Sequence, residues 1–213
     1  MWLLAALLLA VLTWQVRAAT GPLALDLRWT FALDELRSAQ LDRLMQLLHR
    51  AQGKLLAAAI AGWMAALLWR RQWHALLRFT AAIPGGMLAN SAAKLLVARP
   101  RPQLVDAMIG VHGFAYPSGH VAAITLFCGY LVVRIFERTP STHWRGLASL
   151  AALLAVAAVS ASRVYLGAHL PSDALAAVLL GVTWLGLCQH AARLLALTRG
   201  AASEGLPCAP KPS

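Results

Sequence analysis

Charge is scarce in this sequence, and negative charge is scarcest. Only 13% of the 213 residues are charged, with 8 acidic residues against 19 Lys and Arg, whereas 60% are hydrophobic. Soluble domains carry about 25% charged and roughly 45–50% apolar residues. A water-soluble fold could not bury this much apolar surface, and a disordered chain would be poor in Leu and Val. The composition therefore predicts a membrane protein.

Cysteine is also rare. Cys128, Cys188 and Cys208 show neither metal-ligand nor redox-pair spacing, so we assign them no chemistry. The net charge of +11 raises the question of nucleic acid. However, the basic residues are spread between apolar segments, and no run of basic and aromatic residues could follow a phosphate backbone. We expect no nucleic-acid partner; loops at a membrane face and a phosphate site explain the charge better.

Long apolar runs are abundant. A spanning helix needs about 20 mostly apolar residues, and the sequence predicts an all-α, polytopic bundle of six transmembrane helices. The segments are approximately Trp2–Val16, Leu55–Trp69, Ala75–Val97, His120–Phe136, Gly146–Ser162 and Asp173–Leu195. The second and fourth are short unless flanking residues join them. The first lacks Lys or Arg before its apolar run, which disfavours the alternative of a cleaved signal peptide.

These segments divide the chain into three parts. Residues 1–54 comprise the first helix and an outer loop, residues 55–197 a membrane-embedded core, and residues 198–213 a cytoplasmic tail that we expect to be disordered. In the outer loop, Leu41, Leu44, Met45 and Leu48 recur at helical spacing. They predict an amphipathic helix lying flat on the membrane surface, with packing over the mouth of the bundle as the alternative.

Six spans place alternate loops on opposite sides of the membrane. The basic residues of one side are Arg70, Arg71, Arg78, Arg134, Arg138, Arg145, Arg193, Arg199 and Lys211. Only Glu137 and Glu204 accompany them as acids, so the positive-inside rule predicts that this side is cytoplasmic. The remaining acidic residues, and the three polar clusters described next, fall on the outer side.

The first cluster ends the third apolar segment and runs from Lys94 to Arg99, Pro100, Arg101 and Pro102. A Lys in an apolar helix is a candidate functional residue, although it can simply snorkel to the interface. The prolines favour the functional interpretation, because an extended backbone aims the Arg side chains. Arg binds phosphate oxygens through two parallel hydrogen bonds.

The second cluster, Tyr116-Pro117-Ser118-Gly119-His120, opens the fourth segment. Ser and Gly at a helix N-terminus offer a hydroxyl and free backbone N–H groups to an anion, but the same residues are common in ordinary loop-to-helix transitions. His120 favours an anion site, because a titratable group beside a phosphate can move protons.

The third cluster runs from Ser162 and Arg163 to His169 and Asp173, between the fifth and sixth segments. Four residues apart at the start of a helix, His169 and Asp173 should lie on one face. A carboxylate that accepts from Nδ1–H leaves the Nε2 lone pair free for attack or proton transfer. The pair can equally be structural, and its spacing alone does not decide.

Together, the three clusters match a family signature. Lys94-x6-Arg101-Pro102, Pro117-Ser118-Gly119-His120 and Ser162-Arg163-x5-His169-x3-Asp173 resemble the motifs of the type 2 phosphatidic acid phosphatases, which are shared with vanadium haloperoxidases. The resemblance covers roughly residues 60–195. A haloperoxidase is disfavoured, because the members that this chain would resemble are soluble.

The resemblance implies a role for each matching residue. Lys94, Arg101, Ser118, Gly119 and Arg163 would bind the phosphoryl oxygens. His169 would attack phosphorus to form a phosphohistidine, with Asp173 orienting its ring, and His120 would protonate the leaving oxygen and then activate water. Three cations would neutralise the phosphate, so no metal or cofactor is expected. Since His169 must be neutral and His120 protonated, a bell-shaped pH profile is expected.

The resemblance also implies a substrate class. We expect a lipid phosphatase of the bacterial inner membrane whose site faces the periplasm, with membrane lipids as its surroundings. Undecaprenyl diphosphate is the first candidate substrate, and phosphatidylglycerophosphate, phosphatidate and lipid A are alternatives. A non-enzymatic anion channel or transporter would also place Lys and Arg in the membrane, but it has no use for the His169–Asp173 pair and His120.

Overall fold

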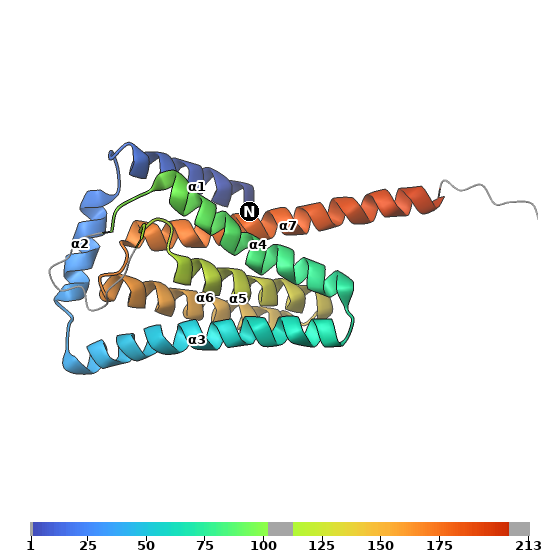
Figure 1. Ribbon diagram of the computed structural model, residues 1–213, viewed down its shortest axis with the longest axis horizontal. Helices are drawn as coiled ribbons and strands as arrows, with labels where there is room; N and C mark the ends of the chain where they lie inside the picture. The colour runs from blue at the N-terminus through green and yellow to red at the C-terminus, as the bar shows by residue number, and fades with distance from the viewer. Residues whose placement is uncertain (1, 102–112, 205–213) are drawn as a thin grey trace, which may run out of the picture.

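The computed structural model describes residues 2–101 and 113–204, with side chains up to residue 197. The described ranges form seven α-helices (Figure 1). These are α1 (Trp2–Arg17), α2 (Leu23–Asp34), α3 (Ala39–Trp69), α4 (Trp73–Val97), α5 (Gly119–Arg138), α6 (Thr142–Tyr165) and α7 (Pro171–Glu204). The predicted all-α class is confirmed, and each of the six apolar segments lies in a helix of its own.

Helix α5 lies at the centre of the bundle and packs against α4, α6 and α7. Its Leu126 is fully buried with Phe79 and Ile83 of α4. The approach of α4 is close, since a Cβ on Gly86 would lie 2.6 Å from a Leu126 methyl carbon. Helix α1 packs along α7.

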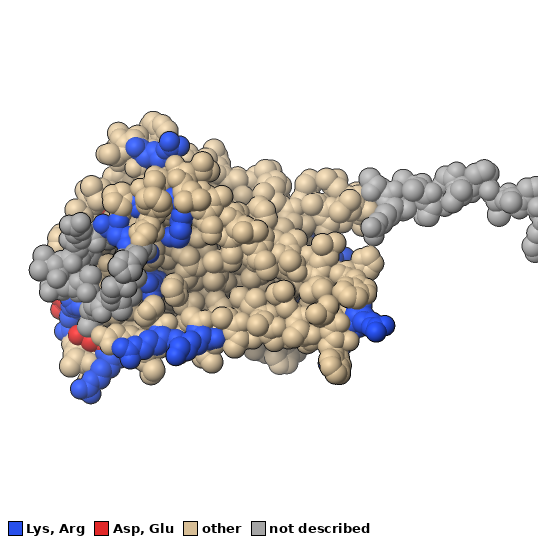
Figure 2. Space-filling model, viewed as in Figure 1, with Lys and Arg blue, Asp and Glu red and all other residues tan. Residues whose placement is uncertain are grey.

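Four of the helices, α3, α5, α6 and α7, are long and apolar enough to cross a membrane. Helix α1 is apolar but shorter. Helix α4 is long enough, with 25 residues, but its most apolar stretch is less apolar than those of these four helices. Large apolar side chains point outward along the bundle, including Leu88, Leu95 and Leu153. Figure 2 shows Lys and Arg gathered mainly toward the α2 end, with few charges along the middle. The chain is a multi-pass membrane protein, and the count of six spans stays a prediction.

The outer loop differs from the prediction of a separate helix lying flat on the membrane. Its amphipathic stretch is the N-terminal half of α3, which continues through the predicted boundary at residues 54 and 55. Flanking residues thus lengthen the second span. Asp42 accepts a hydrogen bond from Tyr165 (2.6 Å), and the carbonyl of Met45 accepts one from Ser162 (3.2 Å). This half of α3 therefore packs beside the end of α6.

Two further features, a short helix and the length of the last helix, were not expected. Helix α2 runs across one end of the bundle, between the end of α1 and the start of α3 (Figure 1). Helix α7 continues through Glu204, past the boundary predicted for the tail at residue 198. Residues 205–213 of that tail lie outside the described residues.

Candidate active site

The three clusters meet at the end of the bundle that α2 crosses (Figure 1). Arg99 and Arg101 follow α4, Ser118 precedes α5, and the third cluster joins α6 to α7. Gly167 shapes the last connection, because its φ of 69° is one that L side chains rarely adopt. The turn brings the N–H groups of Ala168 and His169 back to the carbonyl of Arg163, at 3.1 and 3.3 Å.

His169 and Asp173 lie on one face, as predicted, and both are buried. His169 Nδ1 is 3.7 Å from Asp173 Oδ2, longer than a hydrogen bond, and it has no other partner among the described residues. The carboxylate is fixed independently, since it accepts from Leu170 N (2.9 Å) and Arg99 Nη1 (2.7 Å). Catalytic hydrogen bonds are often long in free enzymes and shorten when substrate binds.

Arg101 determines the tautomer of His169. Its Nη1 lies 3.4 Å from His169 Nε2 and donates to the carbonyl of Ala168 at 2.6 Å, while its Nε donates to the carbonyl of Gly113 at 3.1 Å. A guanidinium only donates, so Nε2 must carry the lone pair and Nδ1 the proton. The atom with a free electron pair therefore lies beside a cation suited to phosphate.

The other predicted phosphate-binding residues surround the same space. A Cβ on Gly119 would lie 4.0 Å from Lys94 Cε, and Lys94 donates to the carbonyl of Phe114 at 2.9 Å. Ser118 and Arg163 are buried, yet Ser118 Oγ and Arg163 Nε lack a hydrogen-bond partner among the described residues. Buried polar atoms without partners are costly, so they suit a bound anion. Pro102 of the motif lies outside the described residues.

Within residues 2–101 and 113–197, no three His, Cys, Asp or Glu side chains gather as a metal site. The groups that do converge are cations, among them Arg101 and Arg163, and the histidines His120 and His169.

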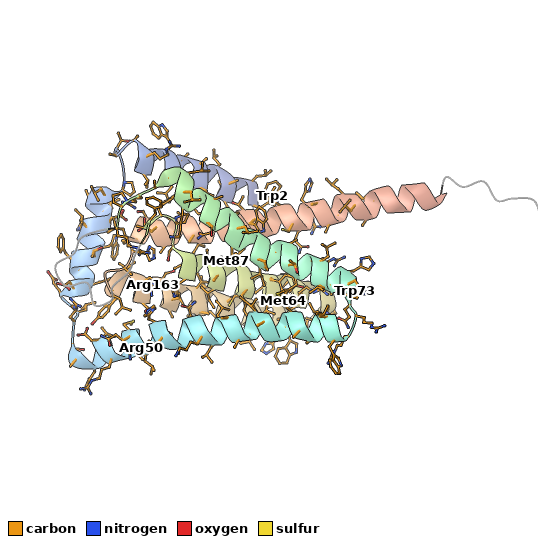
Figure 3. All side chains as sticks on the ribbon, in the orientation of Figure 1. Trp2, Arg50, Met64, Trp73, Met87 and Arg163 are labelled. Carbon is orange, nitrogen blue, oxygen red and sulfur yellow. The ribbon has the colours of Figure 1, made fainter. Side chains whose placement is uncertain are left out.

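His120 borders an apolar groove of about 380 Å³ between α3, α4 and α5. The lining residues are Gln52, Gly53, Leu56, Ala57, Ile60, Met87, Gly119, His120 and Ala123. Figure 3 places Met87 on α4 and Arg163 nearer the α2 end. The groove thus connects the polar site with the apolar flank of the bundle.

Sequence reasoning missed a buried ionic network in which Arg99 pairs with Asp173 and Asp26. Arg99 does not join Arg101 beside His169, but pairs with Asp173 and with the buried Asp26 of α2, at 2.7 and 3.2 Å. Asp26 also accepts from the backbone N–H and the hydroxyl of Ser172, at 2.8 and 2.6 Å. The unexpected α2 therefore holds the start of α7 and the orienting carboxylate.

Arg99→Met is expected to destabilise the protein by about 3 kcal/mol, because two buried carboxylates lose their shared cation. Thermal unfolding in detergent measures the change, and Arg17→Met, at an exposed position, is the matched control. An unfolding midpoint equal to that of the control would contradict a structural role for Arg99.

Burial lowers the pKa of His169 below its usual value near 6.5, although Asp173 raises it. The imidazole is then neutral at pH 7. Because protonation would occupy the lone pair, the loss of activity on the acid side should come as the pH drops through this lowered pKa. The acid limb of kcat/KM, after division by the separately measured ionisation of the substrate, should lie below pH 6.5. An acid limb centred above pH 7 would contradict a neutral, buried nucleophile.

His49 is the second residue that sequence reasoning missed. It had no motif or partner in the sequence, yet its ring lies 5.3 Å from that of His120, and its Nδ1 contacts Arg163. It lies within α3, and the packing of α3 against α6 brings it to the site. His112, near the second cluster, lies outside the described residues.

Comparison with known proteins identifies the fold and the family. A crystal structure of a transmembrane PAP2-type phosphatidylglycerolphosphate phosphatase from Bacillus subtilis superposes with a TM-score of 0.73, at 22% identity, covering 88% of this chain and 95% of that one. No curated protein matches significantly. The family model described as the PAP2 superfamily matches residues 74–195, more than half of the chain. The protein therefore belongs to the PAP2 superfamily and is a membrane-embedded phosphatase.

Proposed function

We propose that this phosphatase removes the terminal phosphate of a lipid diphosphate, with undecaprenyl diphosphate as the first candidate, through a phosphohistidine at His169. The observation that carries the proposal is the unequal surroundings of the two motif histidines. His169 is buried beside Arg101 and Asp173, whereas His120 borders the apolar groove. A lipid is the leaving group of such a reaction, so the acid that protonates it should lie where the tail enters.

In the first step, the Nε2 lone pair of His169 attacks the terminal phosphorus. A P–N bond forms, the P–O bond to the lipid breaks, and the leaving oxygen takes a proton from His120. Lys94, Arg101 and Arg163 offset the negative charge of the transferring group, and the Ser118 hydroxyl donates to it. Asp173 stabilises the imidazole ring as it becomes positive.

In the second step, His120 has lost its proton and can act as a base. It takes a proton from water while the oxygen attacks phosphorus and the P–N bond breaks. Inorganic phosphate leaves, and both histidines return to their starting states. The atoms and charges balance without any group beyond the substrate, water and the residues named.

Phosphatidylglycerophosphate is the second candidate substrate, since the structural neighbour from Bacillus subtilis is a phosphatase for that lipid. Phosphatidate and lipid A also fit a cradle for one phosphate. By analogy with the family, a lipid diphosphate is preferred because the site would face the periplasm, where undecaprenyl diphosphate must be recycled.

Purified protein assayed against these four lipids tests the proposal. We expect phosphate release to be fastest from undecaprenyl diphosphate and absent in the nucleophile variant. Release from phosphatidylglycerophosphate alone would overturn the substrate, and release from no lipid would overturn the proposed function.

The periplasmic orientation is supported by the charge of the opposite end, where Arg70 and Arg71 connect α3 to α4 and Arg138 ends α5. A cysteine introduced for Ser141 should react with a membrane-impermeant thiol reagent only after permeabilisation. Labelling of intact cells would place that end outside and contradict the orientation.

Gly53 lines the groove, so its substitution tests whether the groove binds the lipid tail. A Cβ there would lie 3.8 Å from His120 Nε2, an ordinary contact, but a larger side chain would fill the groove. Gly53→Leu should therefore raise KM for a long-chain lipid phosphate by about tenfold, and Gly53→Ala should have little effect. A short, water-soluble phosphate ester provides the comparison. An equal loss on both substrates would show that the groove does not hold the tail.

A further inference from the structure

His49 belongs to none of the three motifs, yet it is built into the site. It lies on the N-terminal half of α3, and two neighbours on that helix, Asp42 and Met45, bind Tyr165 and Ser162 of α6. Positions 42, 45 and 49 share one face of a helix. The contacts to α6 therefore turn His49 toward Arg163 rather than toward lipid.

The contact with Arg163 determines how His49 is protonated. His49 Nδ1 faces Arg163 Nη1, and because a guanidinium has only donors, Nδ1 must accept. In the neutral ring the proton is then on Nε2. His49 thus offers one N–H donor on the side of its ring away from the Arg163 contact.

His49 is also close to the proposed proton donor. Its ring centroid lies 5.3 Å from that of His120. One turn further along α3, Gly53 and Gln52 line the groove that starts at His120. His49 therefore lies on the side of the site from which the lipid would leave, between an arginine of the phosphate cradle and the groove.

We infer that His49 is a specificity residue that binds a second phosphate on the leaving side of the bond, and so favours substrates with two phosphates over simple monoesters. This inference rests on the proposed function and names the substrate class of the same site. In a diphosphate, the second phosphate is joined directly to the one under attack. An N–H donor beside His120 and Arg163 suits its oxygens.

Two substitutions separate the two sides of the imidazole ring. Asn at position 49 keeps an acceptor near the Nδ1 position for Arg163 but lacks a donor at the Nε2 position, whereas Gln extends its amide toward the Nε2 position. Farnesyl diphosphate and farnesyl phosphate are matched probes, because they differ by one phosphate. Phosphatidylglycerophosphate and phosphatidate form a second pair, in which the extra phosphate is more distant.

His49→Asn should lower kcat/KM for farnesyl diphosphate roughly tenfold and leave that for farnesyl phosphate within about twofold. His49→Gln should retain more of the diphosphate preference. If kcat/KM fell for phosphatidylglycerophosphate but not for farnesyl diphosphate, the phosphate that His49 binds would be the more distant one of phosphatidylglycerophosphate. His74→Asn, exposed at the far end of α4, is the control. The ratio between substrates does not depend on the fraction of folded enzyme.

If His49 only steadied Arg163, Asn would act like the wild-type residue and Gln would lower both activities equally. Either of these results, or no effect of any substitution, would overturn the inference about His49. The proposed phosphatase function would remain. Failure of the wild-type protein to release phosphate from farnesyl diphosphate would overturn the proposed diphosphate substrate itself. The role inferred for His49 would fall with it.

Discussion

His169→Ala is expected to lower phosphate release from every lipid substrate by at least about a thousandfold, as removal of a nucleophile does in other enzymes. The reason lies in the site's geometry. Nε2 of His169 carries a lone pair beside Arg101, and no other described side chain offers a buried, uncharged nitrogen in that position. Water would have to attack phosphorus directly, with only charge neutralisation to assist it.

The rate of inorganic phosphate release by purified protein in detergent measures this loss. His74→Ala, at the opposite end of the bundle, should retain full activity and controls for loss of an imidazole alone. The thermal unfolding midpoint shows whether the variant is folded. Residual activity within about tenfold of wild type would exclude His169 as the nucleophile.

His120→Ala has the second largest expected effect, and its size should depend on the leaving group. Phosphatidate releases an alkoxide that needs a proton, so kcat/KM should fall by about a hundredfold or more. A lipid diphosphate releases a phosphate monoester, which leaves readily without one. Its kcat/KM, which reports steps up to phosphohistidine formation, should fall much less.

Turnover of the diphosphate should nevertheless become slow, because the second step requires His120 to activate water. Rapid mixing of His120→Ala with a lipid diphosphate should then show a burst of released lipid phosphate, followed by a slow steady rate. An equal loss of kcat/KM on both substrates would mean that His120 does not act as the acid.

Much of this site could be predicted from sequence, because its chemistry is concentrated in short motifs. Apolar runs predicted six of the helices to within a few residues at most ends, and the four-residue spacing of His169 and Asp173 predicted their common face. The start of α3 was missed because amphipathic periodicity predicts a helix without showing whether it joins the next one.

The partners of the motif residues could not be predicted. Arg99 and Arg101 are alike in sequence, each followed by a proline, but Arg99 turns toward Asp26 on a helix that periodicity did not indicate. Asp26 and His49 are distant in sequence from every motif. Their roles depend on which helices pack together, and no local spacing reveals that.

The nature of the covalent intermediate tests the account most directly. His120→Ala can be mixed with a lipid diphosphate labelled in its terminal phosphate, quenched in alkali, where phosphohistidine survives, and digested for mass spectrometry. We predict one phosphorylated histidine, His169, with close to one label per active site. Label on His49 or on any residue other than His169, or a burst of lipid phosphate without any label on protein, would contradict it.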